Sequence, residues 1–219
     1  MKSVPVWDLP TRIVHWALAG LVFLALLTGE NEAGFVFTLH ELAGYGILLL
    51  IAFRVPWGFL GSPRSRFSDF LCGLQRVKAY TSQLILHLEP PPYVGHNPLG
   101  GWMVMLLLLL AFLAATSGLY TGRSDEAHGP LAHIGGLGGA FGAIHEGLGN
   151  LLIPLIVLHI FGVLVDWLLT GDNLVRAMID GRKRLDDFAA ARERPLASPL
   201  RAVAVAVAVL LFAAAIVFA

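Results

Sequence analysis

Five long apolar stretches limit what this chain can fold into. They lie at roughly residues 12–28, 37–60, 101–122, 145–170 and 201–219. A helix needs about 20 mostly apolar residues to cross the hydrocarbon core of a bilayer, so each stretch is long enough, or nearly so, to span it. Only 14% of the 219 residues are charged, whereas an average soluble domain carries about 25%. We therefore expect an all-α integral membrane protein, with the lipid bilayer as its solvent.

The first four stretches predict a four-helix transmembrane bundle over residues 1–184. Residues 185–219 predict a linker followed by an additional C-terminal transmembrane helix, because 202–219 contains no charged residue. The first stretch lacks the basic leader of a cleaved signal peptide, so we expect it to be retained. Between the second and third stretches we expect a loop of roughly 40 residues, and over 135–142 a short surface helix with turns.

The basic residues are distributed asymmetrically between the loops. Fourteen of the fifteen lysines and arginines lie at or before the start of the first stretch, near the end of the second or after it, or between the fourth stretch and the start of the last; only Arg123 lies in the opposite loops. Loops rich in these residues stay on the cytoplasmic side, which predicts a cytoplasmic N-terminus. The net charge of zero gives no reason to expect a nucleic-acid partner. The single cysteine, Cys72, excludes an intrachain disulfide and Cys-x-x-Cys-His attachment of haem.

Four histidines stand within or at the ends of the apolar stretches, where ionisable residues are costly and usually functional. The predicted topology places His15 near the cytoplasmic face and His40 near the outer face. His145 lies near the outer face, and His159 lies fourteen residues further along the same helix. Fourteen residues are two heptads, or about 21 Å of helix, so these two point along one seam at different depths. Matching by depth predicts two pairs, His15 with His159 and His40 with His145.

Two imidazoles facing each other from neighbouring helices are typical of bis-histidine haem ligation, which leaves no open position on the iron. Glycines near the histidines would make room for a flat macrocycle: Gly44, Gly46, Gly147, Gly149 and Gly162. Zinc is less well suited, because each depth offers only two histidines. Two other hypotheses remain open. The histidines could line the pathway of a transporter or metal channel without haem, or they could be interhelical hydrogen-bond donors in a structural anchor.

Four sequence motifs surround these histidines. They are Val6-Trp7-Asp8-Leu9-Pro10-Thr11-Arg12-Ile13-Val14-His15-Trp16, then His40-Glu41-Leu42-Ala43-Gly44-Tyr45-Gly46 with Arg54 and Trp57-Gly58, then Gly95-His96-Asn97-Pro98-Leu99-Gly100, and finally His145-Glu146 and His159 with Asn173-Leu174-Val175-Arg176-Ala177-Met178-Ile179. In this combination they resemble the prokaryotic cytochrome b561 family and the nickel-iron hydrogenase cytochrome b subunits. The resemblance covers nearly the whole chain through residue 184.

The resemblance implies a four-helix bundle that holds two b haems in a bacterial inner membrane. It implies electron transfer between the quinone pool and a periplasmic partner, either a c-type cytochrome or a hydrogenase-like enzyme, with quinone as a substrate. The matching axial ligands to iron are His15, His40, His145 and His159. Arg54, at the cytoplasmic end of the second span, is a candidate partner for a haem propionate. We identify no candidate catalytic residue, because the expected role of these side chains is to hold cofactors.

The quinone candidates are Trp57, His96 and Asn97, which lie near the expected cytoplasmic ends of the second and third spans. Pro98 would begin the third span, so we also expect a helix-capping role at positions 96 and 97. His87, together with His128 and His133, is expected to lie in solvated loops. The sequence leaves open the direction of electron flow, the quinone type and the oligomeric state, a homo-oligomer included.

Overall fold

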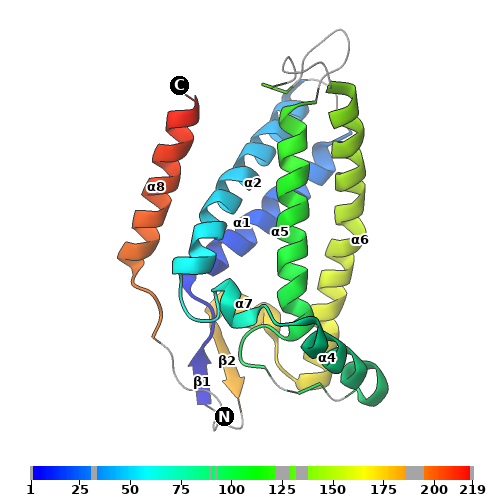
Figure 1. Cartoon of the computed structure of the whole chain (residues 1–219), viewed down its shortest axis with the longest axis vertical. Helices are drawn as coiled ribbons and strands as arrows, with labels where there is room; N and C mark the ends of the chain where they lie inside the picture. The colour runs from blue at the N-terminus through cyan, green and yellow to red at the C-terminus, as the bar shows by residue number, and fades with distance from the viewer. Residues whose placement is uncertain are drawn as a thin grey trace. The chain divides into compact units, whose positions relative to one another are not determined.

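A computed structural model describes residues 2–30, 34–88, 90–91, 93–121, 129–131, 138–185 and 195–217. In these ranges five helices are long and apolar enough to cross a membrane. They are α1 (Leu9–Thr28), α2 (Gly34–Leu60), α5 (Pro98–Leu119), α6 (Gly138–Thr170) and α8 (Pro199–Val217), drawn in Figure 1. The five predicted spans and the all-α membrane class are confirmed.

The large apolar side chains of these helices are widely exposed. In the most apolar window of α6, only 6% of the residues are buried inside the protein, and Leu168 is 83% exposed. A protein in water rarely exposes large contiguous apolar surface. Because hydrocarbon solvates these side chains without penalty, the exposed surface is consistent with the protein's place in the bilayer.

Two expectations about the connections were wrong. The region between α2 and α5 is not only a loop, because it forms α3 (Phe67–Phe70) and α4 (Leu74–His87). Residues 138–142, for which we expected a separate surface helix and turns, are the first residues of α6, and 135–137 lie outside the described residues. The glycines of this segment do not interrupt α6, since the cost of a glycine in a helix is only about 1 kcal/mol and many following residues propagate it.

Close contacts divide the chain into two compact units, which we describe separately. The first unit consists of residues 1–15, 53–105 and 158–219, and the second of residues 16–52 and 106–157. Four of the long helices contribute segments to both units. Each unit contains one of the two predicted histidine pairs.

In the second unit, α5 packs on its neighbours through two apolar clusters. Ala111 of α5 contacts Ile47 and Ile51 of α2 in a cluster that also includes residues of α1. Leu110 and Ala114, further round α5, pack on α6 in a second cluster. The small alanines allow close approach of the helix backbones, a common device between membrane helices.

Gly46 has the same role between α1 and α2. A Cβ atom at this position would lie 2.7 Å from Cδ1 of Leu21. Our expectation that Gly46 makes room for a macrocycle was therefore wrong, because the space beside it is filled by a side chain of α1. By contrast, Cβ atoms at Gly44, Gly147, Gly149 and Gly162 would meet no atom within 4 Å.

In the first unit, a two-stranded antiparallel ribbon joins the start of the chain to the segment after α6 (Figure 1). Strand β1 (Lys2–Pro5) pairs with β2 (Arg182–Leu185) so that Lys2 lies opposite Leu185 and Pro5 opposite Arg182. The sequence analysis did not predict these strands. They are short and rely on pairing between residues nearly 180 positions apart, which local patterns do not reveal.

The short helix α7 (Leu174–Asp180) precedes β2 and is defined at both ends. At its start the Asn173 side chain accepts a hydrogen bond from the amide of Arg176 at 2.8 Å. At its end Gly181 adopts a left-handed φ of +80°, which places its carbonyl so that it accepts from the amides of Val6 and Trp7. These are the usual cap residues at each end of a helix.

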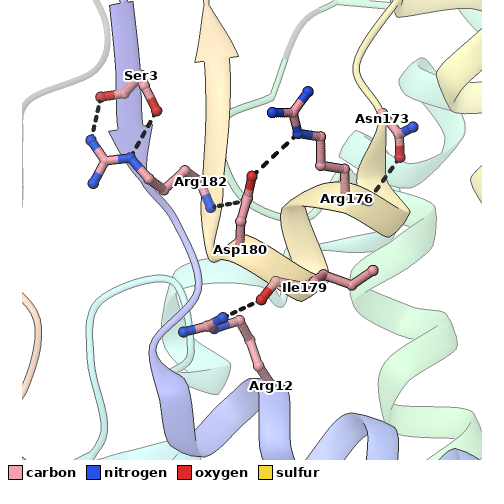
Figure 2. A network of polar contacts seen from close by, with 7 residues as sticks. All are labelled: Ser3, Arg12, Asn173, Arg176, Ile179, Asp180 and Arg182. Atoms are coloured by element: carbon pink, nitrogen blue, oxygen red, sulfur yellow. Dashed lines mark hydrogen bonds and ion pairs between the residues drawn. The ribbon is translucent and has the colours of Figure 1, made fainter.

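Side chains reinforce this junction, as Figure 2 shows. Arg182 donates to the hydroxyl of Ser3 at 2.8 Å and to its carbonyl at 2.9 Å, and Arg12 of α1 donates to the carbonyl of Ile179. Val6 and Trp7 pack on Ala177. The start of α1 is therefore attached to the segment that follows α6.

The start of α8 and the residues just before it contact the end of α2 and the residues just after it. The amide of Ala197 donates to the Ser62 hydroxyl at 2.8 Å, and Arg201 donates to the carbonyl of Leu60 at 3.1 Å. These bonds are made by polar groups at the ends of apolar helices, where backbone carbonyls lack helical partners.

Substitution of Gly181 tests the junction. A Cβ at Gly181 would be strained by the positive φ and would lie 2.7 Å from the carbonyl oxygen of Trp7, whereas Gly171 shares the positive φ (+73°) but has open space around it. We expect Gly171→Ala to cost about 1–2 kcal/mol of stability and Gly181→Ala to cost more. The measurement is the thermal unfolding midpoint of each variant in detergent. Equal losses in the two variants would show that contact with Trp7 is not important.

Candidate haem-binding sites

The first predicted pair lies in the second unit, where α2 presents His40 and α6 presents His145. Their ring centres are 5.7 Å apart, and the ring planes are nearly perpendicular, at 87°. Both side chains are partly buried. The structure therefore brings together two histidines separated by more than 100 positions in the sequence.

Each ring of this pair is oriented by a backbone carbonyl. Nδ1 of His40 lies 2.9 Å from the carbonyl oxygen of Ala25 in α1, and Nδ1 of His145 lies 2.7 Å from that of Ala114 in α5. Because a carbonyl can only accept, each Nδ1 carries the hydrogen in these bonds. The neutral rings then keep the lone pair on Nε2, the atom that would bind a metal.

The second predicted pair lies in the first unit, where α1 presents His15 and α6 presents His159. Their ring centres are 6.4 Å apart and their planes are inclined by 56°. Both residues are partly buried. The pairing expected from depth is therefore the pairing that the helices adopt.

The geometry of both pairs fits a metal between two imidazoles. With each ligating nitrogen about 2 Å from the metal, two opposed imidazoles have their ring centres about 6 Å apart. In the part of the chain that the structure describes, no three or more His, Cys, Asp or Glu side chains gather in a way that could hold a metal ion. Each site therefore offers two imidazoles, which would supply the two donors that a haem iron needs in addition to its porphyrin nitrogens.

Open space lies on the ligand faces of these helices. Gly44 follows His40 by four residues, Gly149 follows His145 by four, and Gly162 follows His159 by three. Residues three or four apart share a helix face. Because Cβ atoms at these three glycines would meet nothing within 4 Å, the ligand faces can accept a flat ring. Gly147, two residues after His145, is open as well but points to another side of α6.

Arg54 is buried near the end of α2, with 5% of its surface exposed. One guanidinium nitrogen donates to the carbonyl of Ser65 at 3.1 Å, and the guanidinium carbon lies 4.9 Å from the ring centre of Phe67. The other terminal nitrogen, Nη1, is buried without a hydrogen-bond partner among the described residues. A buried, unsatisfied guanidinium donor favours an anionic ligand such as a carboxylate.

Two of the three quinone candidates already use their polar groups within the protein. The indole nitrogen of Trp57 donates to the carboxylate of Asp8 at 3.2 Å. Asn97 accepts from the amide of Gly100 at 2.7 Å, which caps α5 as expected, and it donates to Asp166 at 2.9 Å. Trp57 and Asn97 therefore have structural roles in the first unit.

His96 differs from these two residues. Its ring lies against Trp7 and Phe70, with ring centres 4.5 and 4.6 Å away. Its Nδ1 is buried and has no hydrogen-bond partner among the described residues. Burial, with further contributions from the positive charges of Arg54 and Lys183, lowers the pKa of His96 to about 3. The ring is therefore neutral at physiological pH, with a polar atom available to a ligand.

The sequence analysis missed several residues that support these sites. The carbonyls of Ala25 and Ala114 carry no side-chain signal at all. Asp8 caps α1 by accepting from the amide of Thr11 at 3.0 Å. In the sequence, Lys183 is only one of the basic residues that indicate the orientation of the chain. In the structure its side chain is 4% exposed, and its Nζ atom lies 3.5 Å from a carboxylate oxygen of Asp172. Its pKa is lowered by burial and raised in part by that carboxylate.

The remaining histidines lie away from both pairs or outside the description. His87, the last residue of α4, is exposed as expected. His128 and His133 lie outside the described residues.

Comparison with known proteins identifies the family. The pattern of the prokaryotic cytochrome b561 family matches residues 6–181, a region that contains all four paired histidines. This chain belongs to the prokaryotic cytochrome b561 family. Membership implies haem b as cofactor and supports membrane electron transfer, as the motifs predicted. No solved structure matches the chain.

Three relatives of this cytochrome b561 family member illustrate the similarity, and each is named a probable Ni/Fe-hydrogenase B-type cytochrome subunit. The protein of Rhizobium leguminosarum bv. viciae is 27% identical, over 85% of this chain and 91% of the relative. Its counterpart for hydrogenase 1 in Escherichia coli (strain K12) is 25% identical, over 80% and 88%. The protein of Cupriavidus necator is 21% identical, over 85% and 89%.

The buried neutral ring of His96 predicts a specific acid sensitivity. Its pKa is about 3 in the folded protein, against 6.5 for an ordinary histidine, so between these values the unfolded chain binds more protons. The stability linked to His96 is present above pH 6.5 and is lost as the pH falls toward 3, by up to about 1.4 kcal/mol per pH unit. We expect His96→Gln to flatten the pH dependence of the unfolding midpoint between about pH 6.5 and 4.

The exposed His87 provides the control for this measurement. His87→Gln should leave the acid profile of the wild-type protein unchanged, because this side chain is solvated in the folded protein. An acid loss as steep in His96→Gln as in the wild-type protein would contradict the neutral, buried state of His96.

Proposed function

We propose that this chain is a di-haem b-type cytochrome that transfers electrons across a bacterial inner membrane, between the quinone pool and a periplasmic redox partner. The observation that carries the proposal is the presence of two facing histidine pairs, with ring centres 5.7 and 6.4 Å apart. The axial ligands are His40 with His145 at one site and His15 with His159 at the other. Haem held in this way exchanges one electron at a time and has no open position for oxygen.

The charge asymmetry supports one orientation. With the N-terminus in the cytoplasm, the loops after α2 and α6 lie on the cytoplasmic side, where fourteen of the fifteen basic residues gather. The His40–His145 site is then the outer site, and the His15–His159 site is the inner one. Electrons move between a periplasmic protein and quinone by way of these two sites.

The four ligands and the match over residues 6–181 support a di-haem domain over 1–184. We assign residues 185–219 to a linker and an additional membrane helix, α8. No ligand to haem is expected from this second part, because the described portion of α8 is made of apolar residues after Arg201.

The periplasmic partner is either a hydrogenase-like enzyme or a c-type cytochrome. The names of the relatives favour the hydrogenase, since each is described as a subunit associated with a Ni/Fe-hydrogenase. Proteins that co-purify with the chain from its native membrane would distinguish the two partners.

At the inner site, Arg54 is the candidate donor to a haem propionate. Its free Nη1 atom is buried, so a carboxylate would satisfy it at little further cost in desolvation. His96 is the strongest of the three quinone candidates, because Trp57 and Asn97 use their polar groups elsewhere. A neutral histidine can donate a hydrogen bond to a quinone carbonyl.

Removal of single histidines tests the haem assignment. In purified protein we expect two b haems per chain from the pyridine haemochrome spectrum, and one or none in His15→Ala, His40→Ala, His145→Ala and His159→Ala. Without one of its two histidines, a haem would be held only by the remaining histidine and by packing. The exposed His87→Ala variant should retain both haems.

Two outcomes of this experiment would contradict the proposal. A folded, haem-supplied protein without haem would favour the transporter or metal-channel hypothesis. Unchanged haem content and spectra in all four variants would instead assign the histidines to interhelical hydrogen bonds.

The quinone site needs a separate test. In His96→Ala we expect quinol to reduce the haems at least about tenfold more slowly, because one hydrogen bond to the quinone is worth about 1.4 kcal/mol or more. Reduction by dithionite, which needs no quinone site, should give the wild-type spectrum. Quinol-driven reduction at the wild-type rate would remove His96 from the site.

A further inference from the structure

Two short segments that hold the outer histidines share a sequence pattern. They are Ala25-Leu26-Leu27-Thr28-Gly29 at the end of α1 and Ala114-Ala115-Thr116-Ser117-Gly118 near the end of α5. Each has alanine first, a hydroxyl residue three positions later and glycine directly after it. We call them the α1 cradle and the α5 cradle. Both belong to the second unit.

The α1 cradle contacts His40 through all three of these positions. The carbonyl of Ala25 accepts from Nδ1 at 2.9 Å, and the Thr28 hydroxyl oxygen lies 3.5 Å from the same atom. A Cβ at Gly29 would lie 3.4 Å from Cε1 of the ring. Ala25 is one of the last four residues of α1, whose carbonyls lack helical donors, so it is free to accept from a side chain.

The α5 cradle contacts His145 in the same way but more tightly. The carbonyl of Ala114 accepts from Nδ1 at 2.7 Å, and the Ser117 hydroxyl oxygen lies 3.5 Å from that atom. A Cβ at Gly118 would lie 3.0 Å from Cε1 and 3.2 Å from Nδ1. Only a residue without a side chain allows the ring to lie this close to α5.

The hydroxyl groups distinguish the two cradles. Thr28 donates to the carbonyl of Leu24 at 2.7 Å and lies 3.3 Å from that of Ala25, so His40 is the main donor to Ala25. Ser117 donates to Ala114 at 2.8 Å, and this carbonyl is therefore shared between Ser117 and His145. A shared acceptor polarises each donor less, so these hydroxyl groups can tune the basicity of the two rings.

We propose that the α1 and α5 cradles are matched positioning elements, which set the orientation and the basicity of the two outer ligands. This inference rests on the proposed haem ligation by His40 and His145. The two cradles approach the site from different helices, and each fixes one ring through a carbonyl and a glycine. The near-perpendicular arrangement of the rings, at 87°, is the result of these two constraints.

The ring angle has a spectroscopic consequence. In low-spin ferric haem, near-parallel imidazole planes give a rhombic EPR spectrum, whereas near-perpendicular planes give a strongly anisotropic spectrum with a large maximum g value. The outer site should therefore give the more anisotropic of the two signals, because the inner rings are inclined by only 56°. The outer signal is assigned as the one missing from His40→Ala.

Gly118→Ala is the decisive variant, tested in the purified, full-length, haem-loaded protein. The added methyl group must displace the His145 ring, so we expect the outer EPR signal to shift and the outer midpoint potential to change while the inner signal stays as in the wild type. Gly29→Ala should have a smaller effect, because its Cβ would lie further from the ring. Gly139→Ala is the matched control on α6, since its Cβ would meet nothing within 4 Å.

A second variant removes a group without adding bulk, so it does not depend on a steric clash. Ser117→Ala removes the hydroxyl that competes for the carbonyl of Ala114, which strengthens the hydrogen bond from His145 and should lower the outer midpoint potential at unchanged haem content. Thr38→Ala is the control, because the exposed Thr38 hydroxyl bonds only to the backbone of its own helix.

The outcomes separate this inference from the proposed function. Two haems in the wild-type protein, with an outer signal that shifts or disappears in Gly118→Ala and persists in Gly139→Ala, support the cradles. Two haems with identical EPR spectra and potentials in Gly118→Ala, Ser117→Ala and the wild type would overturn the cradles and leave the haem assignment intact. A wild-type protein without haem at this pair would overturn both.

Discussion

Hydrocarbon does not solvate polar groups, and this constraint governs how each buried imidazole in the protein can be placed. A neutral histidine has one donor and one acceptor nitrogen, and both need a partner away from water. At the His40–His145 pair the donors are satisfied by the carbonyls of Ala25 and Ala114. Nε2 of each ring is then the acceptor nitrogen. The backbone of neighbouring helices thus determines which nitrogen is offered to a metal.

The His15–His159 pair depends on a different arrangement. His15 lies six residues into α1, and the chain just before α1 is held against the segment after α6. This attachment combines the β1–β2 ribbon, the packing of Trp7 on Ala177 and the turn at Gly181. Since α6 itself carries His159, the polar junction at the ends of the two helices restrains the elements that present both histidines of this pair. A short soluble-type structure therefore supports a site made by membrane helices.

Several buried polar residues of the first unit, which contains the His15–His159 pair, divide into satisfied and unsatisfied groups. Asp8, Trp57 and Asn97 form hydrogen bonds within the protein, and they stabilise the ends of α1, α2 and α5. Arg54 and His96 each retain a buried donor or acceptor without a partner among the described residues. Unsatisfied buried groups are costly, so their presence beside a candidate cofactor site is most simply explained by ligands that complete them.

Much of the architecture could be predicted from sequence alone. Apolar length determined five spans, because hydrocarbon thickness sets the length of a crossing helix. The fourteen-residue spacing of His145 and His159, together with the predicted topology, predicted which of the four histidines lie together. The motifs around them gave the family. The tertiary structure decided what local patterns do not encode: the ribbon between residues far apart in sequence, the packing role of Gly46, and the carbonyls that orient His40 and His145. Every residue has a carbonyl, so no sequence pattern marks the one that a neighbouring helix will use; only the packing of the helices selects it.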